Sequence, residues 1–256
     1  MTKLFIVGIG GKMGQAVCKR ASGLETFEVV GGLDVMPDMD FKVFMHAKDV
    51  NVDYDVIIDF SNPKCLDSII ELTKKNPRPV ILATTGYDKK GLDKIGTLAK
   101  KVPVFMSGNM SWGIFVMQKL VSEAVKNLWD SFDVEIIEKH HNQKLDAPSG
   151  TAKMLADTIC QTVGIDGGCP RTNDKPNLVY GREGMRAKRN PCDVTIHAVR
   201  GGTVVGEHEV NFYGNDEVIT LSHTALSRTI FADGALRAAQ FLTDKPCGLY
   251  HMKDMG

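Results

Sequence analysis

The feature that most constrains this chain is the regular alternation of short apolar runs with amphipathic stretches between residues 3 and 109. The apolar runs are rich in Ile and Val and have the length of buried strands. They lie at 3–9, 27–34, 54–61, 78–86 and 102–109. Stretches with helical spacing of apolar residues lie between several of them, at 12–21, 63–76 and 90–101. This order predicts a Rossmann-like α/β domain, with a parallel doubly wound sheet and right-handed crossovers.

The pattern changes near residue 112. A longer amphipathic helix is predicted at 112–129, and strand-like runs follow with few helices between them, at 132–141, 192–201, 205–214 and 217–226. Such runs favour an open mixed or antiparallel sheet, so we expect a second, α+β domain. The final stretch, 228–248, again has helical spacing, with Pro246 and Gly248 as stop signals.

Composition excludes several classes of partner. The 256 residues carry 31 basic and 31 acidic side chains, so there is no net field to attract nucleic acid or an anionic membrane. The apolar N-terminal run is too short to span a membrane. The six cysteines include no C-x-x-C pair and no spacing typical of a zinc site or a disulfide framework. We therefore expect a reducing cytoplasm and no metal.

A glycine cluster follows the first predicted strand. Gly8, Gly11 and Gly14 match G-x-x-G-x-x-G, a variant of the dinucleotide fingerprint, with Gly10 as an extra glycine. Glycines there let backbone N–H groups approach a pyrophosphate at the positive end of a helix. The alternative interpretation is an ordinary turn that needs glycine for positive φ.

An acidic residue supports the nucleotide interpretation. Asp34 closes the second predicted strand about 20 residues beyond the glycines, where a carboxylate accepts hydrogen bonds from the adenosine ribose. It could instead cap a turn. No Arg follows it to bind a 2′-phosphate, which leaves Lys12 in the glycine loop as the candidate for that charge. We therefore expect NADH to be used well and NADPH to be tolerated.

Small and polar residues end two further strands, at 83–87 (ATTGY) and 107–113 (SGNMSWG). Ligands of open α/β sheets lie outside the carboxyl ends of the strands, so both segments point to the same site. The alternative is that both are merely turns.

The stretch EKHHNQKLDAPSG, residues 138–150, combines groups for proton transfer. Strand alternation places Glu138 and His140 on one face, with Lys139 and His141 on the other. Lys144 lies four residues after His140, close enough to converge with it on one small molecule if the chain turns. A metal site and a solvated loop are the alternatives, but Lys is a poor metal ligand.

The same stretch leads into a helix. Ser149 is a candidate N-cap, and apolar residues with helical spacing follow it. The N–H groups of Gly150 and Thr151 would then lie at a helix N-terminus, which suits a carboxylate.

These motifs resemble the dihydrodipicolinate reductase family of bacterial lysine biosynthesis, also called 4-hydroxy-tetrahydrodipicolinate reductases. The matching blocks occur in the family's order and span nearly the whole chain. They are GIGGKMG, IDFSNP, ATTGY, GNMSWGI, EKHHNQKLDAPSGTA, RGGTVVGEHEVNF and SHTALSRTIFADGALRAAQFL. The block around His140 is the most specific of them.

The resemblance implies a role for each matching residue. His140 is the general acid or base and Lys144 the second proton donor, while His141, Gly150 and Thr151 bind the substrate. The cofactor-binding residues it implies are Gly8, Ile9, Gly10, Gly11, Lys12, Met13, Asp34, Ala83, Thr84, Thr85, Ser107, Gly108, Asn109 and Met110. The chain departs from the commonest family pattern at Ala83 and at Ser107-Gly108.

The resemblance also implies a homotetramer of two-domain subunits. Residues 1–111 and 224–256 would form the dinucleotide-binding domain, completed by the C-terminal helix, and 112–223 the substrate and tetramerisation domain. The implied reaction is the NAD(P)H-dependent reduction of a small cyclic dicarboxylate, (2S,4S)-4-hydroxy-2,3,4,5-tetrahydrodipicolinate, to (S)-2,3,4,5-tetrahydrodipicolinate.

Two other functions remain as alternatives. One is another amino-acid-pathway dehydrogenase, which would share the glycine cluster but has no reason to carry the block at 138–150. The other is a dinucleotide-sensing protein without turnover, which would need no proton donor. A basic run, Arg182 to Arg189, is either a solvated loop or a segment that closes over an anionic substrate, and Arg200 is expected to pair with an internal acid or to hold the domain junction.

Overall fold

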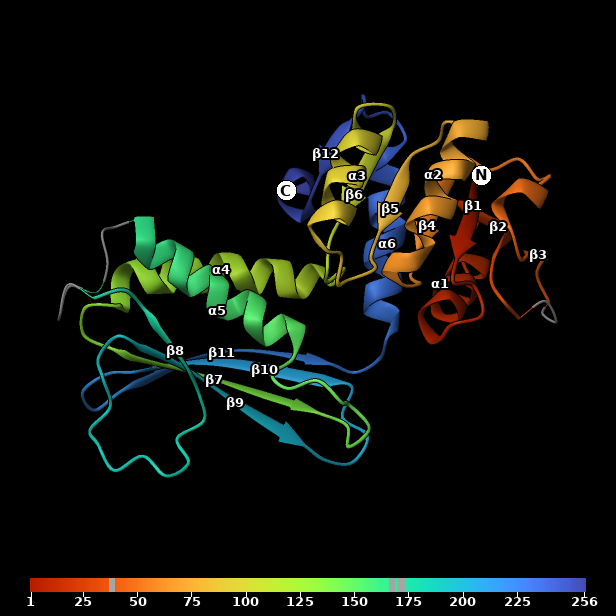
Figure 1. Cartoon of the computed structure of the whole chain (residues 1–256). Helices are drawn as coiled ribbons and strands as arrows, with labels where there is room; N and C mark the ends of the chain where they lie inside the picture. Colours follow the sequence, from red (N-terminus) through yellow and green to blue (C-terminus); the bar gives the residue numbers. More distant parts are fainter. Residues whose placement is uncertain (37–39, 166–168, 170–173) are drawn as a thin grey trace. The chain divides into compact units, whose positions relative to one another are not determined.

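The computed structural model describes residues 1–36, 40–165, 169 and 174–256. The chain divides into two compact units (Figure 1). Unit 1 comprises Met1–Trp112 and Arg228–Gly256, and unit 2 comprises Gly113–Ser227. The domain boundary expected from the sequence, between residues 223 and 224, falls inside the strand Val218–Ala225. In the structure this strand belongs wholly to unit 2.

Unit 1 is built on a seven-stranded parallel sheet of order β12-β6-β5-β4-β1-β2-β3. The strands are β1 (Thr2–Val7), β2 (Phe27–Leu33), β3 (Val43–Phe44), β4 (Val56–Asp59), β5 (Val80–Leu82), β6 (Pro103–Met106) and β12 (Gly248–Tyr250). The chain order reverses at β1, between β4 and β2, and this is where an open parallel sheet leaves a crevice for ligands. The predicted Rossmann-like fold is confirmed.

Helices cover both faces of this sheet. They are α1 (Lys12–Ser22), α2 (Leu66–Lys75), α3 (Lys89–Ala99) and α6 (Thr229–Leu242), with the short 3-10 helices η1 (Ala47–Asp49), η2 (Pro63–Cys65) and η3 (Met252–Met255). Phe5, Ile57 and Leu82 pack with apolar residues of α2 and α3 in one core cluster. Phe105 of β6 is fully buried, and its ring centroid lies 6.3 Å from that of Phe241 on α6.

Unit 2 contains a five-stranded mixed sheet of order β11-β10-β7-β9-β8. Its strands are β7 (Asp133–His140), β8 (Asn177–Tyr180), β9 (Asp193–Arg200), β10 (Gly206–Tyr213) and β11 (Val218–Ala225). The central strand β7 runs parallel to β9 and antiparallel to β10. The mixed sheet is one of the two forms expected from the sequence.

Helices α4 (Trp112–Leu128) and α5 (Gly150–Ile165) cover one face of this sheet (Figure 1). Val134 and Ile136 of β7 point into the core that these helices close, together with Val121 and Leu155. The opposite face carries Glu135 and Lys139 of β7, which alternate with the core residues. The buried face of the strand is therefore apolar at its start, at Val134 and Ile136, and polar at its end, at Glu138 and His140.

Three short strands were not expected from the sequence. They are β3, β8 and β12, with two, four and three residues, too short to show a clear alternation. The last helix was expected to run towards Pro246, but α6 ends at Leu242 and Gly248 begins β12. Gly248 is thus a strand residue and does not act as a helix stop.

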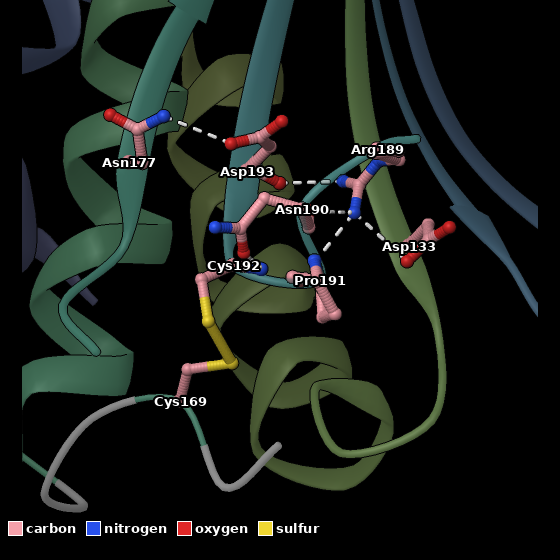
Figure 2. Close-up of a disulfide and its surroundings, with 8 residues drawn as sticks. All are labelled: Asp133, Cys169, Asn177, Arg189, Asn190, Pro191, Cys192 and Asp193. Carbon is pink, nitrogen blue, oxygen red and sulfur yellow. Dashed lines mark hydrogen bonds and ion pairs between the residues drawn. A yellow bond between two sulfur atoms is a disulfide. The ribbon is translucent and has the colours of Figure 1, made fainter. Parts of the chain in front are cut away.

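A disulfide joins Cys169 to Cys192, although the sequence suggested no disulfide (Figure 2). The two residues are 23 positions apart in sequence, and their Cα atoms are 5.9 Å apart. The pairing depends on how the segment before β9 folds back, which spacing alone does not reveal. The expectation was therefore wrong for this pair.

Candidate active site

The glycine loop connects β1 to α1 in unit 1. Gly8 has a φ of +81°, and a Cβ atom there would lie 2.9 Å from the carbonyl oxygen of Phe60. A Cβ atom on Gly14 would lie 2.2 Å from the carbonyl oxygen of Gly8. Gly11 is the N-cap of α1 and offers no side chain to the helix end. The loop is therefore packed backbone against backbone, and the exposed Lys12 begins the helix.

Asp34 lies directly after β2 and faces this loop. Its Oδ2 accepts a hydrogen bond from the Gly10 N–H at 2.8 Å, and its Oδ1 accepts one from the Val35 N–H at 2.7 Å. A cavity of about 400 Å³ adjoins Gly8, Gly10, Asp34 and Ser61. Ile9 is fully buried beneath the loop and Met13 is half-buried, so they hold the loop in place more than they line it.

The ends of β5 and β6 lie at the same edge of the sheet as the glycine loop, because all the strands of this sheet are parallel. Ala83, Thr84 and Thr85 follow β5, and the Ala83 N–H donates to the carbonyl oxygen of Asp59 at 3.0 Å. Ser107, Gly108, Asn109 and Met110 follow β6. Ser107 Oγ donates a hydrogen bond to the Asn109 carbonyl oxygen at 2.6 Å, and this bond stabilises the turn.

A buried carboxyl group, Asp59, lies at the end of β4 beside these turns. It is fully buried, it accepts hydrogen bonds from the Ser61 N–H and hydroxyl, and Tyr87 donates its hydroxyl to Oδ2 at 3.2 Å. Burial raises the pKa of Asp59, and these hydrogen bonds only partly offset the effect. Neither the Asp59 carboxyl nor the Tyr87 hydroxyl was predicted as a site group, since an Asp at a strand end is common.

His140 is the last residue of β7 in unit 2 and is 9% exposed. It lies on the core face together with Glu138, as alternation predicts. Its Nδ1 is 2.6 Å from Glu138 Oε2. The imidazole also packs edge to face against His208 of β10, with ring centroids 5.1 Å apart. The orientation of the ring is therefore set by groups on two strands.

Glu138 is a fully buried carboxylate with several donors around it. Arg200 of β9 binds it in a bidentate manner, with N–O distances of 2.7 and 2.8 Å, and the Ser149 N–H donates to Oε1 at 2.9 Å. Burial alone would raise the pKa of Glu138, but the hydrogen bonds from Arg200, His140 and Ser149 outweigh it and lower the pKa. The carboxylate is therefore ionised, and Arg200 pairs with an internal acid as expected.

Lys144 and His141 lie in the turn after β7. The Lys144 ammonium is 2.8 Å from Asp146 Oδ1, and its side chain is 21% exposed. The His141 N–H donates to the Val204 carbonyl oxygen at 2.7 Å. His141 therefore lies beyond the end of the strand, with its backbone fixed.

The pKa of His140 is lowered, chiefly by burial of the ring. The Glu138 carboxylate acts in the opposite direction and favours the protonated ring, while the charges of Lys144 and Arg200 lower the pKa further. Burial and the two cations thus favour the neutral ring, and the Glu138 carboxylate favours the protonated one.

Helix α5 begins at Gly150, with Thr151 in its first turn, as predicted. Ser149 caps it, because the hydroxyl oxygen accepts a hydrogen bond from the Ala152 N–H at 3.1 Å. The same hydroxyl is 2.9 Å from His208 Nε2. His208 is 4% exposed, and burial lowers its pKa to about 3, so its ring is neutral.

The basic run is not a solvated loop as a whole. Arg189 contacts Asp133 and Glu135 at 2.9 Å each, and Arg182 contacts Glu135 at 3.1 Å and Asp193 at 3.4 Å. Figure 2 shows the Arg189 guanidinium between Asp133 and the backbone of the segment that leads into β9. These two arginines tie the segment to the charged face of the sheet.

Other classes of site find little support in the described parts of the chain. Among those residues, no group of three or more His, Cys, Asp and Glu side chains could hold a metal ion. Nor does any helix of those residues have the length and hydropathy needed to cross a membrane.

The glycine loop at the crevice of a Rossmann-like sheet is typical of an oxidoreductase that uses a nicotinamide dinucleotide, and unit 2 adds an imidazole beside an ionised carboxylate. Comparison with known families makes this specific. Residues 2–110 match the model of the dihydrodipicolinate reductase N-terminus, and residues 113–255 match that of the C-terminus. The chain belongs to the dihydrodipicolinate reductase family.

Individual relatives are similar to this chain over its full length. The 4-hydroxy-tetrahydrodipicolinate reductase of Clostridium novyi (strain NT) is 44% identical, with 100% of this chain and 98% of that protein covered. That of Caldanaerobacter subterraneus subsp. tengcongensis is 46% identical with the same coverage. A solved structure, the dipicolinate-bound dihydrodipicolinate reductase of Paenisporosarcina sp. TG-14, is 28% identical with a TM-score of 0.78, covering 98% of this chain and 97% of that one.

Proposed function

We propose that this chain is a 4-hydroxy-tetrahydrodipicolinate reductase of diaminopimelate and lysine biosynthesis. It reduces (2S,4S)-4-hydroxy-2,3,4,5-tetrahydrodipicolinate to (S)-2,3,4,5-tetrahydrodipicolinate. The observation that carries the proposal is the full-length likeness to reductases of this name, combined with an intact cluster of His140, Lys144 and Glu138. A dinucleotide sensor would have no use for that cluster.

The substrate is a small diacid, and we assign its binding to the segment between β7 and α5. We assign one substrate carboxylate to the first turn of α5, where the N–H groups of Gly150 and Thr151 lie at the positive end of the helix. His141 and Lys144 supply polar and cationic contacts in the preceding turn. The dipicolinate bound to the Paenisporosarcina enzyme is a diacid of the same kind.

The reaction removes water from the hydroxylated ring and adds a hydride and a proton, so substrate, reduced nicotinamide and H⁺ give product, oxidised nicotinamide and water. A bound reduced nicotinamide would supply the hydride to the conjugated carbon. The resulting enamine must then gain a proton on carbon, and we assign this step to His140. Lys144 is the second proton donor and offsets the negative charge that develops as electrons move into the ring.

The residues present fit a nicotinamide dinucleotide. The cavity of about 400 Å³ beside Gly10 and Asp34 adjoins the N-terminus of α1, which suits a pyrophosphate. Asp34 would accept hydrogen bonds from the adenosine ribose. We assign the nicotinamide to the turns at 83–85 and 107–110. With Val35 and Met36 after Asp34, NADH is expected to serve well and NADPH to be tolerated.

We further propose a cytoplasmic homotetramer, joined through the sheet of unit 2. The face of this sheet opposite α4 and α5 exposes apolar side chains, with Val199 48% exposed, Tyr213 40% and Val218 54%. Lys139 and Glu207 lie on the same face and form an ion pair of 3.1 Å. A second copy of such a face would cover the apolar residues and complement both charges. Light scattering should give four times the monomer mass, and Val218→Lys should lower it.

A coupled assay tests the proposed reaction. The substrate is generated in place from pyruvate and aspartate semialdehyde by the preceding synthase, and oxidation of NADH or NADPH is followed by absorbance. Oxidation should require the synthase, both precursors and this chain. Absence of turnover with either cofactor, from protein that is folded and binds NADH, would refute the proposed reaction.

A further inference from the structure

The environment of His140 contains more than the groups that the reaction needs. A fully buried carboxylate, Glu138, lies 2.6 Å from His140 Nδ1, and it does so from the same face of the same strand. Both residues belong to β7, whose pairing with β9 and β10 fixes the register of their backbones. The carboxylate therefore meets one particular ring nitrogen.

We propose that Glu138, held by Arg200, is the positioning residue for His140: it accepts the Nδ1–H and so directs Nε2 towards the substrate. The role of Glu138 in catalysis rests on the proposed function, whereas the contacts of Glu138 with His140 and Arg200 do not depend on it. An ionised carboxylate is an acceptor only, so the proton between the two groups belongs to Nδ1 in the neutral ring. Nε2 is then the nitrogen that exchanges a proton.

Arg200 and Ser149 make Glu138 a fixed acceptor. Arg200 binds both carboxylate oxygens, at 2.7 and 2.8 Å, and donates a further hydrogen bond to the Asp146 carbonyl oxygen at 2.7 Å. The Ser149 N–H donates to Oε1 at 2.9 Å. The carboxylate thus links β9, the turn that carries Lys144 and the start of α5 to the catalytic ring.

A glycine on the neighbouring strand keeps the other edge of the ring open. A Cβ atom on Gly206, the first residue of β10, would lie 3.0 Å from His140 Nε2. No side chain therefore covers that nitrogen from this position. Nδ1 of His140 therefore contacts Glu138, and no side chain at position 206 covers Nε2.

The charged and titratable groups around the ring come from several elements. Glu138 lies on β7, Lys144 in the following turn, Arg200 on β9 and His208 on β10. Glu138 is the only one of these four that favours the protonated imidazole, since the two cations oppose it and His208 is neutral. Removal of its charge should therefore lower the pKa of His140.

The first test needs no variant of Glu138. Long-range proton–nitrogen NMR of the ¹⁵N-histidine-labelled protein distinguishes the two neutral tautomers, and the His140→Gln spectrum assigns the signals. We expect neutral His140 to carry its proton on Nδ1. A proton on Nε2 would overturn the proposal, whatever the outcome of the activity assay.

The second test compares Glu138→Gln with Glu138→Asp. Loss of the charge should lower the His140 pKa measured by NMR and shift the high-pH limb of kcat to lower pH, because turnover needs the protonated ring. We expect kcat to fall on the order of 100-fold, the cost of a misplaced catalytic group, with KM nearly unchanged. Glu138→Asp keeps the charge and should retain more activity than Glu138→Gln.

Glu123→Gln is the matched control, because it removes an exposed carboxylate that pairs with Lys126 at 3.2 Å on α4. It should leave the pH profile unchanged. A purely structural role for Glu138 would lower the amount of folded protein but keep the wild-type pH profile and tautomer, and that result would contradict the proposal. If Glu138→Gln does not fold, Arg200→Lys, which keeps the charge but loses the bidentate contact, should also lower kcat without changing KM.

Discussion

Glu138 Oε2 lies 2.6 Å from Nδ1 of His140, and the two residues share the buried face of β7. This contact places a carboxylate behind the imidazole and leaves the opposite nitrogen for chemistry. The proposed catalytic role of His140 would thus depend on a strand that carries both partners, whereas Lys144, the proposed second proton donor, lies in a turn.

The first prediction concerns His140. His140→Gln removes the group to which we assign the proton transfer, so kcat should fall about 100- to 10,000-fold, the usual contribution of a general acid or base. NADH binding should be unchanged, since His140 belongs to unit 2 and the glycine loop to unit 1. Steady-state kinetics and calorimetric titration with NADH measure the two effects. Unchanged turnover would rule out the assigned role.

The second prediction concerns the glycine loop. Gly14→Ala would place a Cβ atom 2.2 Å from the Gly8 carbonyl oxygen and 2.7 Å from Ile9 Cα, both of them backbone atoms. The loop must therefore shift, and NADH affinity should fall strongly. Gly96→Ala is the matched control, because nothing lies within 4 Å of its Cβ position in α3, and it should stabilise the fold by up to about 1 kcal/mol. Equal effects of the two changes on NADH affinity would contradict this explanation.

The third prediction concerns acid stability. Burial raises the pKa of Glu135, but hydrogen bonds from His197, Arg189 and Arg182 lower it overall. A depressed folded-state pKa stabilises the fold above the unfolded value, 4.5, and this contribution is lost as pH falls through the folded-state pKa. The free energy of unfolding of unit 2 should therefore decline below pH 4.5, and Glu135→Gln should flatten that decline.

Trp129 reports this transition. It is 4% exposed in the core of unit 2, and the other tryptophan, Trp112, lies in unit 1. In a Trp112→Phe background, urea unfolding followed by fluorescence at several pH values gives the free energy of unfolding of unit 2. A decline that is as steep in Glu135→Gln as in its parent would exclude Glu135 as the source.

The fourth prediction concerns the disulfide. A cross-link that spans 23 residues restricts the unfolded chain and should stabilise unit 2 by about 3 kcal/mol. Cys192→Ser should lose this contribution under oxidising conditions and should match the wild type in reductant. Cys247→Ser is the control, because Cys247 is exposed and free. Equal stability of Cys192→Ser and oxidised wild type would show that the cross-link does not stabilise the fold.

Local patterns were enough to predict much of the fold and the general location of the site. The strand before Gly8, the alternation of Glu138 with His140 and the helix start at Ser149 all depend on neighbouring residues in the sequence. Each of these features is present in the structure. The roles of His140, Lys144, His141, Gly150 and Thr151 in catalysis and substrate binding remain predictions, as do those of the cofactor-binding residues.

The particular partners that distant contacts bring together were not predicted: Arg200 was expected to pair with an internal acid or to hold the domain junction, but the sequence did not identify Glu138 as that acid. Arg200 reaches Glu138 because His140 is in register with Arg200 between β7 and β9, and His208 pairs with Glu138 between β10 and β7. Strand register cannot be obtained from a single sequence with any certainty, because many alignments satisfy the same apolar pattern. The disulfide was missed for a similar reason, since it depends on the path of the chain between Cys169 and Cys192.

The most direct test of the proposed reaction follows the hydride itself. NADH deuterated at both C4 positions is supplied to the wild-type protein with the substrate generated in place, and the product is analysed by mass spectrometry. We predict that the tetrahydrodipicolinate gains one deuterium for each NADH oxidised. Oxidation of the cofactor with an unlabelled product, or no oxidation at all, would contradict the assignment of this chain as the reductase.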